Sequence, residues 1–427
     1  MKNIVIFICL LLPALAFSQG ETAVPFLLIT SAPDANGMGG ISATLPSENA
    51  MATISNPGQL GLQSLDSYAH ASFYAPTTGW LPGFQQYGMS YYVSALNLGI
   101  DLRKAAGISL PLSIGFGYSR VHMNLGRYTI TGGSPIPMEF EAQDNSQNFS
   151  LAIGLDYVVR LGAGITYKSI ESTIAWLDPP GRGPVAANVP AYDLGILMDI
   201  PAFDIASRLS GNNVTLFKNT QPLFDIMTGY SLSNYGNDKL IYMDHAQEDP
   251  LPRKGTLGLN VKVGLSSQTG FQPWEYFSFT FAREAEDVLV SWSTDTVKDN
   301  NGGIVSISDP HYVYQGLLGD LNFFDNVIKS EGNGNVWLRR GWQLNLGEVL
   351  YLRGGSVNAP GLQYTTSGFS FRMRGIFHLI ETLNTAKSLP LLDFVAVHFD
   401  LQYDHSSESS EGPRNGTTYN GLTVILK

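Results

Sequence analysis

The chain has 427 residues, of which only 14% are charged, and its formal net charge is −11. An acidic balance of this size argues against a nucleic-acid binder, because such proteins carry basic patches for the phosphate backbone. The only cysteine is Cys9, inside the N-terminal apolar run, so the rest of the chain has no disulfide and no thiolate site.

Residues 1–18 have the pattern of a secretory signal peptide. Lys2 precedes an apolar run from Ile4 to Phe17, and Ala16-Phe17-Ser18 is a small-x-small site that predicts cleavage after Ser18. An uncleaved anchor helix is the alternative. The apolar run is short for a membrane span and no stop-transfer pattern follows, so we expect an exported, cleaved chain.

The next stretch, from Asn36 to Gly61, is compact and rich in Gly, Ala and Ser. Three glycines crowd its start, and Asn56-Pro57-Gly58 marks a turn near its end. Its apolar residues follow neither a helical nor a strand period. The pattern predicts an irregular segment, which we bound at residues 19–64.

From residue 65 onward, short segments alternate between large apolar residues and small or charged ones. In "FSLAIGLDY" the side chains of Phe149, Leu151 and Ile153 share one face, and Ser150, Ala152 and Gly154 share the other. Roughly 14 to 16 such segments follow one another, each long enough to cross a bilayer when tilted. A soluble β-sandwich would also alternate, but its outer face would not be uniformly large and apolar.

Backbone groups in lipid must be paired internally, so these strands have to close on themselves. The sequence therefore predicts an all-β fold, a transmembrane antiparallel β-barrel of about 14 strands over residues 65–427. A barrel of about this size is too wide for its own side chains to fill. We expect residues 19–64 to fold into the lumen as a plug, with a motif made by Gly37, Met38, Gly39, Gly40, Asn56, Pro57 and Gly58.

Polar, turn-rich stretches separate the strands, and the longest is a candidate partner-binding loop. It spans residues 295–321 and carries Tyr312, Tyr314, Leu317 and Leu318, which the pattern leaves exposed. Helical spacing predicts short helices over residues 314–330 and 375–388. Inside the barrel we expect Arg372 and Arg374 to pair with Asp400 and Asp156.

Two further expectations concern the last strands and the tryptophans. Alternation from Val395 to Asp404 predicts a strand with His398 in the lumen. Five tryptophans near segment ends suggest aromatic girdles at the membrane boundaries: Trp80, Trp176, Trp274, Trp292 and Trp342.

Catalytic motifs are scarce. The seven histidines show no metal-ligand spacing, and the chain has no Walker motif and no G-x-S-x-G elbow. We expect no catalytic residues, no metal, no cofactor and no enzymatic activity.

Several motifs, in the right order along the chain, resemble one known family. "GMGG" at Gly37–Gly40 and "NPGQL" at Asn56–Leu60 are followed by "LAIGLDYVVRLGAGITYKSIES", "YDLGIL", "YSLSNYGNDKLIY", "LPRKGTLGL" and "GWQLNLGEVLYLRGGS". Together they resemble the PorV/PorQ family, outer-membrane barrels of Bacteroidetes related to the FadL-type transporters. The departures include Asp34-Ala35-Asn36 before "GMGG" and Gly58 after Asn-Pro.

The resemblance implies a bacterial outer-membrane barrel of the type IX secretion system. Such a barrel binds exported cargo proteins that carry a sorting domain and passes them to a cell-surface attachment complex. Its partners would be outer-membrane lipid, cargo and other components of the secretion system. The alternative is a FadL-like outer-membrane transporter of hydrophobic small molecules. An apolar pocket beside the plug would favour transport, and apolar loops at the extracellular rim would favour protein binding.

Overall fold

A computed structural model describes most of the chain between residue 22 and residue 427. The described ranges are 22–66, 68–76, 78–107, 109–130, 138–176, 184–211, 214–217, 219–236, 239–242, 248–267, 274–293, 296–298, 304–307, 311–383 and 390–427. The predicted signal peptide lies outside them.

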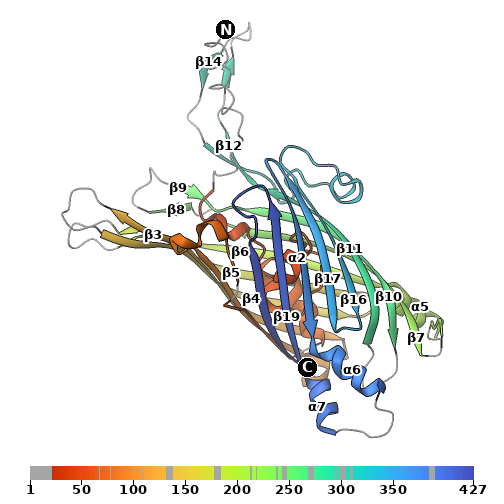
Figure 1. Cartoon of the computed structure of the whole chain (residues 1–427). Coiled ribbons are helices and arrows are strands. Elements are labelled where there is room, and N and C mark those ends of the chain that lie inside the picture. Colours follow the sequence, from red (N-terminus) through yellow and green to blue (C-terminus); the bar gives the residue numbers. More distant parts are fainter. Residues whose placement is uncertain are drawn as a thin grey trace, which may run out of the picture.

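Fourteen strands close into one antiparallel barrel, which confirms the predicted fold class (Figure 1). Each strand pairs with its neighbours along the chain, and β1 pairs with β20 to close the wall. The barrel strands are β1 (Ala69–Tyr74), β2 (Ser90–Asp101), β3 (Leu112–Ile130), β4 (Met138–Asp156), β5 (Arg160–Trp176), β6 (Pro184–Pro201), β7 (Thr220–Tyr235), β10 (Lys254–Ser267), β11 (Trp274–Val288), β16 (Trp337–Leu346), β17 (Leu350–Ala359), β18 (Leu362–Arg372), β19 (Phe399–Ser410) and β20 (Thr418–Leu426).

The wall follows the predicted alternation. On β4, Phe149, Leu151 and Ile153 are 52%, 47% and 54% exposed on the outer face, while Ala152 between them is 2% exposed. Large apolar side chains repeat in this way around the barrel. Contact of such an outer face with water is unfavourable, and contact with acyl chains is favourable, so this face is a lipid-facing belt.

The connections distinguish the two ends of the barrel. At one end lie the turns 157–159 and 347–349 and two short helices, α4 (Leu102–Ala106) and α5 (Ala202–Ser210). At the other end the chain from residue 289 to residue 336 forms one long connection. Long loops lie outside the cell and short turns face the periplasm, so the second end, at the top of Figure 1, is extracellular.

The extracellular connections carry small ladders of their own. Three two-stranded sheets pair β8 with β9, β12 with β15 and β13 with β14. Their bounds, with those of the two extracellular helical turns, are β8 (Lys239–Ile241), β9 (Glu248–Pro250), β12 (Val290–Ser293), β13 (Thr296–Lys298), β14 (Ile304–Ile307), β15 (His311–Tyr314), η4 (Pro82–Tyr87) and the π-helical η5 (Phe323–Lys329).

The periplasmic end corrects one predicted strand. The chain from β18 to β19 forms α6 (Met373–Leu383) and α7 (Pro390–His398), so β19 begins at Phe399 and not at Val395. Pro390 supplies a fixed φ for the first helical position. In α7 apolar residues stand at both odd and even positions, and a short run of that kind suits a helix as well as a strand. Within the described residues no helix is long and apolar enough to span a bilayer.

The predicted tryptophan girdles are wrong for two of the five residues. Trp80 is 6% exposed inside the lumen, and Trp274 is 9% exposed beside the periplasmic helices. Trp342 lies on the outer face and Trp292 on the extracellular β12. The side chain of Trp176 lies outside the described residues.

The belt makes a prediction about stability in a bilayer. Replacing Leu151 with Arg should lower the free energy of unfolding by about 2–4 kcal/mol, because a charge near the membrane centre loses its hydration. The matched control is Tyr157→Arg in the turn below the belt, where Tyr157 is 66% exposed and the cost should be about 0–1 kcal/mol. Denaturant unfolding in lipid vesicles measures both, and equal costs would contradict this placement of the belt.

Candidate functional site

The N-terminal segment, residues 22–66, lies inside the barrel (Figure 1). It is not irregular throughout, as the sequence suggested, but contains η2 (Pro25–Leu28), α2 (Pro33–Gly37), η3 (Ala50–Ile54) and α3 (Gly58–Asp66). These helices are too short for an apolar period to show. We call residues 22–66 the lumenal segment.

The predicted Gly37–Gly40 motif lies against a glycine-lined part of the wall. Gly39 and Gly40 have φ of +76° and +77°, which other residues rarely adopt. A Cβ on Gly39 would stand 2.8 Å from the carbonyl oxygen of Arg340 and 2.9 Å from that of Ser356. Across the gap, a Cβ on Gly341 or Gly355 would collide with the backbone of Met38. Here two backbones touch with no side chain between them.

The second motif, Asn56-Pro57-Gly58, occupies a matching position on the opposite wall. Asn56 is fully buried, accepts from the N–H of Gly58 at 2.9 Å and donates to the carbonyl of Ala43 at 2.8 Å and of Ile196 at 3.2 Å. The wall that contacts this motif, strands β4 to β6, is again lined by glycines. A Cβ on any of these glycines would collide with the lumenal segment: Gly154, Gly162, Gly164 and Gly195.

Two charged side chains that the sequence reasoning missed hold this segment to the wall. Glu284 of β11 accepts from the backbone N–H groups of Ser42 and Thr44, at 3.0 and 2.8 Å, and from the Thr44 hydroxyl at 2.8 Å. Arg339 of β16 donates to the carbonyl of Gly39 at 3.0 Å and pairs with Glu286 at 3.2 Å. The signal was present in "FAREAEDV", whose carboxylates alternate on the lumenal face.

The extracellular half of the lumen contains an apolar, aromatic cluster beside buried ion pairs such as Lys168 with Asp193. Tyr74, Trp80, Tyr91 and Tyr419 pack with ring centroids 5.4–6.2 Å apart. Val24 and Phe26 of the lumenal segment, 4% and 1% exposed, belong to the same buried cluster. The segment's first residues therefore fill an apolar site inside the barrel.

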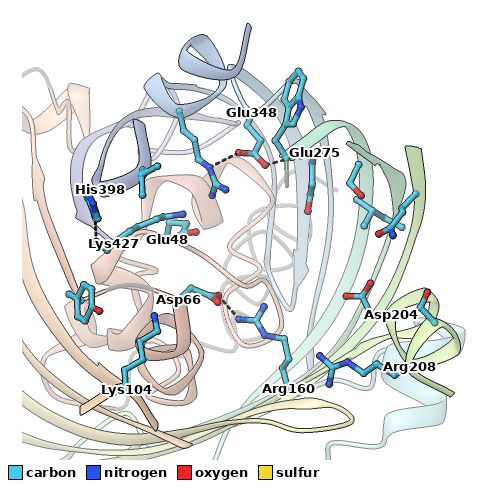
Figure 2. A pocket seen from close by; sticks show the side chains of 18 residues that line it. Glu48, Asp66, Lys104, Arg160, Asp204, Arg208, Glu275, Glu348, His398 and Lys427 are labelled. Atoms are coloured by element: carbon cyan, nitrogen blue, oxygen red, sulfur yellow. Dashed lines mark hydrogen bonds and ion pairs between the residues drawn. The ribbon is translucent and has the colours of Figure 1, made fainter. Parts of the chain in front are cut away.

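The periplasmic half is a wide polar cavity, which we call the vestibule (Figure 2). It has a volume of about 860 Å³, and a smaller cavity of about 190 Å³ continues from it between the segment and the wall. The smaller cavity is lined mainly by charged and polar side chains, so it is not the apolar pocket that would favour transport. Glu48 and Glu275 line both cavities. Five carboxylates and five cations line the vestibule: Glu48, Asp66, Asp204, Glu275 and Glu348, with Lys104, Arg160, Arg208, Arg374 and Lys427. Because these charges are equal in number, the vestibule has no preference for anions or for cations.

Ion pairs organise this lining. Arg374 pairs with Glu348 at 3.4 Å, and Arg160 pairs with Asp66. Burial alone would raise the pKa of Glu48, but Lys427, Arg372 and other neighbouring groups outweigh it and hold that pKa well below its usual range. Glu48 therefore stays ionised and ties the segment to the base of the barrel.

The lumenal pairs predicted from sequence are right in part. Arg372 and Asp400 form an ion pair at 2.6 Å, and the backbone N–H of Arg374 donates to Asp400 at 3.0 Å. Asp156 is not part of this group, because it lies near Arg208 at the periplasmic turn. His398 ends α7 and so is not on a strand as expected, but it does lie at the lumen, where it lines the vestibule.

The candidate partner-binding residues do not form one exposed surface. Tyr312 donates to Asp249 at 2.9 Å and packs on Trp292, and Tyr314 stacks under Arg253 at 4.7 Å, so both rings are half-buried. Leu317 and Leu318 are 57% and 52% exposed. No group of His, Asp or Glu among the described residues is arranged to hold a metal ion.

Comparisons with known proteins give structural likeness only. No family model and no curated protein matches the chain. Among solved structures it is similar to a FadL homologue of Pseudomonas aeruginosa (8% identity, 95% of this chain and 98% of that chain, TM-score 0.38). It is also similar to the toluene transporters TbuX of Ralstonia pickettii (10%, 92% and 96%, 0.36) and TodX of Pseudomonas putida (9%, 92% and 96%, 0.36).

At these scores the likeness carries no functional argument. The barrel itself does carry one for location. A closed wall with every strand paired and an apolar outer belt is the β-structure that spans a bilayer, and bacteria assemble such barrels in the outer membrane. The protein is therefore a barrel of the bacterial outer membrane.

The Glu284 contacts predict how firmly the lumenal segment is held. Glu284→Ala should leave two buried N–H groups without an acceptor, at a cost of about 1–3 kcal/mol each. We expect more frequent channel openings in planar bilayers. Glu141→Ala, which removes a carboxylate that is 52% exposed, is the control and should behave as wild type. Unchanged conductance in a folded Glu284→Ala barrel would contradict a closing role for the segment.

A second prediction concerns pH and α6. His378 is 1% exposed, and its ring stacks on Trp274 with centroids 5.2 Å apart. Burial, helped by Arg374 and Lys427 and opposed by Asp400, lowers the pKa of His378 to about 4. The unfolded chain takes up a proton near pH 6.5, so the stability from neutral His378 is present above that pH and is lost as pH falls toward 4.

We therefore expect α6 to open more often at pH 5 than at pH 7.5. Amide hydrogen exchange over residues 373–380, corrected for the intrinsic effect of pH, measures this opening. His378→Phe keeps the stacking and removes the titration, so its exchange should not depend on pH. Exchange in α4, which has no histidine, is the internal reference.

Proposed function

We propose that the protein is an outer-membrane transporter that admits hydrophobic small molecules when the lumenal segment shifts. The observation that carries the proposal is the division of the lumen. Apolar residues of the segment fill an aromatic site in the extracellular half, and a polar vestibule faces the periplasm below it. Passage, and not catalysis, is the activity we infer.

The first residues of the segment are the part whose displacement loses the least stabilising free energy. Val24 and Phe26 are held by apolar contacts, and the N–H of Ala23 donates to the carbonyl of Pro250 at 2.9 Å. Burying a side chain of the size of Phe contributes about 1.5–3 kcal/mol, and an apolar ligand of similar size would regain that free energy in the same site. Exchange of Phe26 for such a ligand therefore changes the total free energy little.

The rest of the segment is held by polar groups that an apolar ligand cannot replace. Glu284, Arg339 and Asn56 each bond to backbone atoms of the segment or fix its turn. Displacement would begin at the extracellular end and proceed toward the 190 Å³ cavity beside Glu48. The vestibule offers an apolar molecule little apolar surface, so release toward the periplasm follows.

The proposal makes a prediction about ligand affinity. Phe26→Ala removes the internal competitor, so a hydrophobic probe should bind more tightly. If removal of the Phe26 side chain makes binding of the probe about 1.4 kcal/mol more favourable, the affinity for the probe rises about tenfold. Phe84→Ala, at a residue 38% exposed on η4, is the matched control. Titration of the purified barrel with a radiolabelled long-chain fatty acid measures both, and weaker or equal binding by Phe26→Ala would overturn the proposal.

A second candidate function is the binding and shuttling of exported cargo proteins, which the PorV/PorQ resemblance implies. One observation favours it. The ladder of β12 and β15 exposes Trp292 (42%) and Val313 (39%) above the extracellular rim, and aromatic anchors often carry interface energy. Tyr312 and Tyr314 are less suited to this role, because they already pack within the loop.

A deletion strain separates the two candidates. Loss of transport should slow growth on a hydrophobic nutrient and leave surface proteins in place. Loss of a shuttle should release sorting-domain proteins into the medium or trap them in the periplasm. Complementation with Trp292→Ser should restore growth on the nutrient under the first function. Under the second it should fail to restore surface display.

A further inference from the structure

Residues 316–336 fold back over the outside of the barrel. A Cβ on the outward Gly255 of β10 would meet the carbonyl oxygen of Leu317 at 3.3 Å, and the N–H of Asp320 donates to Asp287 of β11 at 2.7 Å. Ala285 and Leu338, on the outer faces of β11 and β16, are 0% and 6% exposed beneath this loop. We call residues 316–336 the saddle. It covers the extracellular margin of the lipid-facing wall.

Two arginines lie at the lower edge of the saddle. Arg283 of β11 and Arg340 of β16 are directly opposite in the ladder. Ala282 and Glu284 face the lumenal segment, so Arg283 between them points outward. Arg283 donates to the carbonyl of Ile328 at 2.6 Å, and Arg340 donates to the Ser330 hydroxyl at 3.1 Å. The saddle thus orients both guanidinium groups.

Neither arginine forms a salt bridge with a carboxylate of the described residues. On the saddle, Asp325 is paired with Lys329 at 2.6 Å, and Glu331 is exposed. Like charges directly opposite each other in a ladder destabilise the pair. An anion between the two guanidinium groups would remove that repulsion, and guanidinium matches phosphate in geometry and charge.

The next outward pair toward the membrane is apolar. Phe281 and Trp342 are opposite each other in the same ladder and are 40% and 41% exposed. The Arg283 guanidinium lies 5.3 Å from the centre of the Phe281 ring. Two residues along a strand span about 6.8 Å, so a charged pair stands one step above an aromatic pair at the edge of the belt. This order matches a lipid, with its headgroup above its acyl chains.

We propose that Arg283 and Arg340 bind the phosphate of an outer-leaflet lipid whose acyl chains lie on Phe281 and Trp342. The saddle adds apolar surface for acyl chains on the outer side of the site, because the η5 side chains Phe324 and Ile328 are 69% and 43% exposed. The proposal does not depend on what passes through the lumen. It assigns a lipid-binding role to a wall surface that faces away from the lumenal segment.

Native mass spectrometry of the full barrel in detergent tests the site. The probe is a phosphorylated lipid A, titrated beside the same lipid without its phosphates and beside inorganic phosphate. Wild type should retain one phosphorylated lipid at least tenfold more tightly than the lipid without phosphates. The double variant Arg283→Gln/Arg340→Gln should lose that difference. Inorganic phosphate should not compete at equal concentration.

Two controls keep the result decisive. Arg103→Gln removes an exposed positive charge from α4 at the periplasmic end and should bind as wild type. Arg283→Lys/Arg340→Lys keeps both charges and should retain most of the preference. Heat-modifiable migration verifies that each variant is folded. Equal lipid binding by wild type and the Gln double variant overturns the proposal, as does full competition by inorganic phosphate.

Discussion

The structure depends on backbone-to-backbone contact between the lumenal segment and a wall without side chains. Met38–Gly40 lies on Gly341 and Gly355, and Pro57–Gly61 lies on Gly162 and Gly164. A barrel of fourteen strands leaves an interior too wide for ordinary side chains, so a second layer of backbone is needed to fill it. Glycine on both surfaces allows that layer to approach within van der Waals distance.

Close approach brings polar backbone groups into a space without water, and each must find a partner. Glu284 and Arg339 meet this need with opposite charges, one accepting from Ser42 and Thr44 and the other donating to Gly39. The first residues of the segment bring few such groups to the wall and are held by apolar contacts instead. The same segment is therefore fixed at its centre and exchangeable at its beginning.

The barrel could be predicted because period two is a local property that lipid enforces on every strand, as at Leu151 and Ile153. The contacts between the lumenal segment and the wall could not be predicted from spacing, since Glu284 and Ser42 are far apart in the sequence. Tyr312 looked exposed because a loop pattern does not show that Asp249 and Trp292 pack against it. The closing role of residues 19–64 and the boundaries of this segment stay predictions.

Strand β11 shows how one period-two pattern serves three environments. Phe281 meets acyl chains, Ala282 meets the lumenal segment, Arg283 stands at the outer margin of the belt, and Glu284 holds Ser42 and Thr44. Adjacent residues thus act on opposite sides of the wall, and β11 itself is held by hydrogen bonds to a neighbouring strand along both of its edges. Changes at Arg283 should therefore alter lipid contact without loosening the segment, while changes at Glu284 should do the reverse. The alternation separates what the barrel does toward the membrane from what it does toward its lumen.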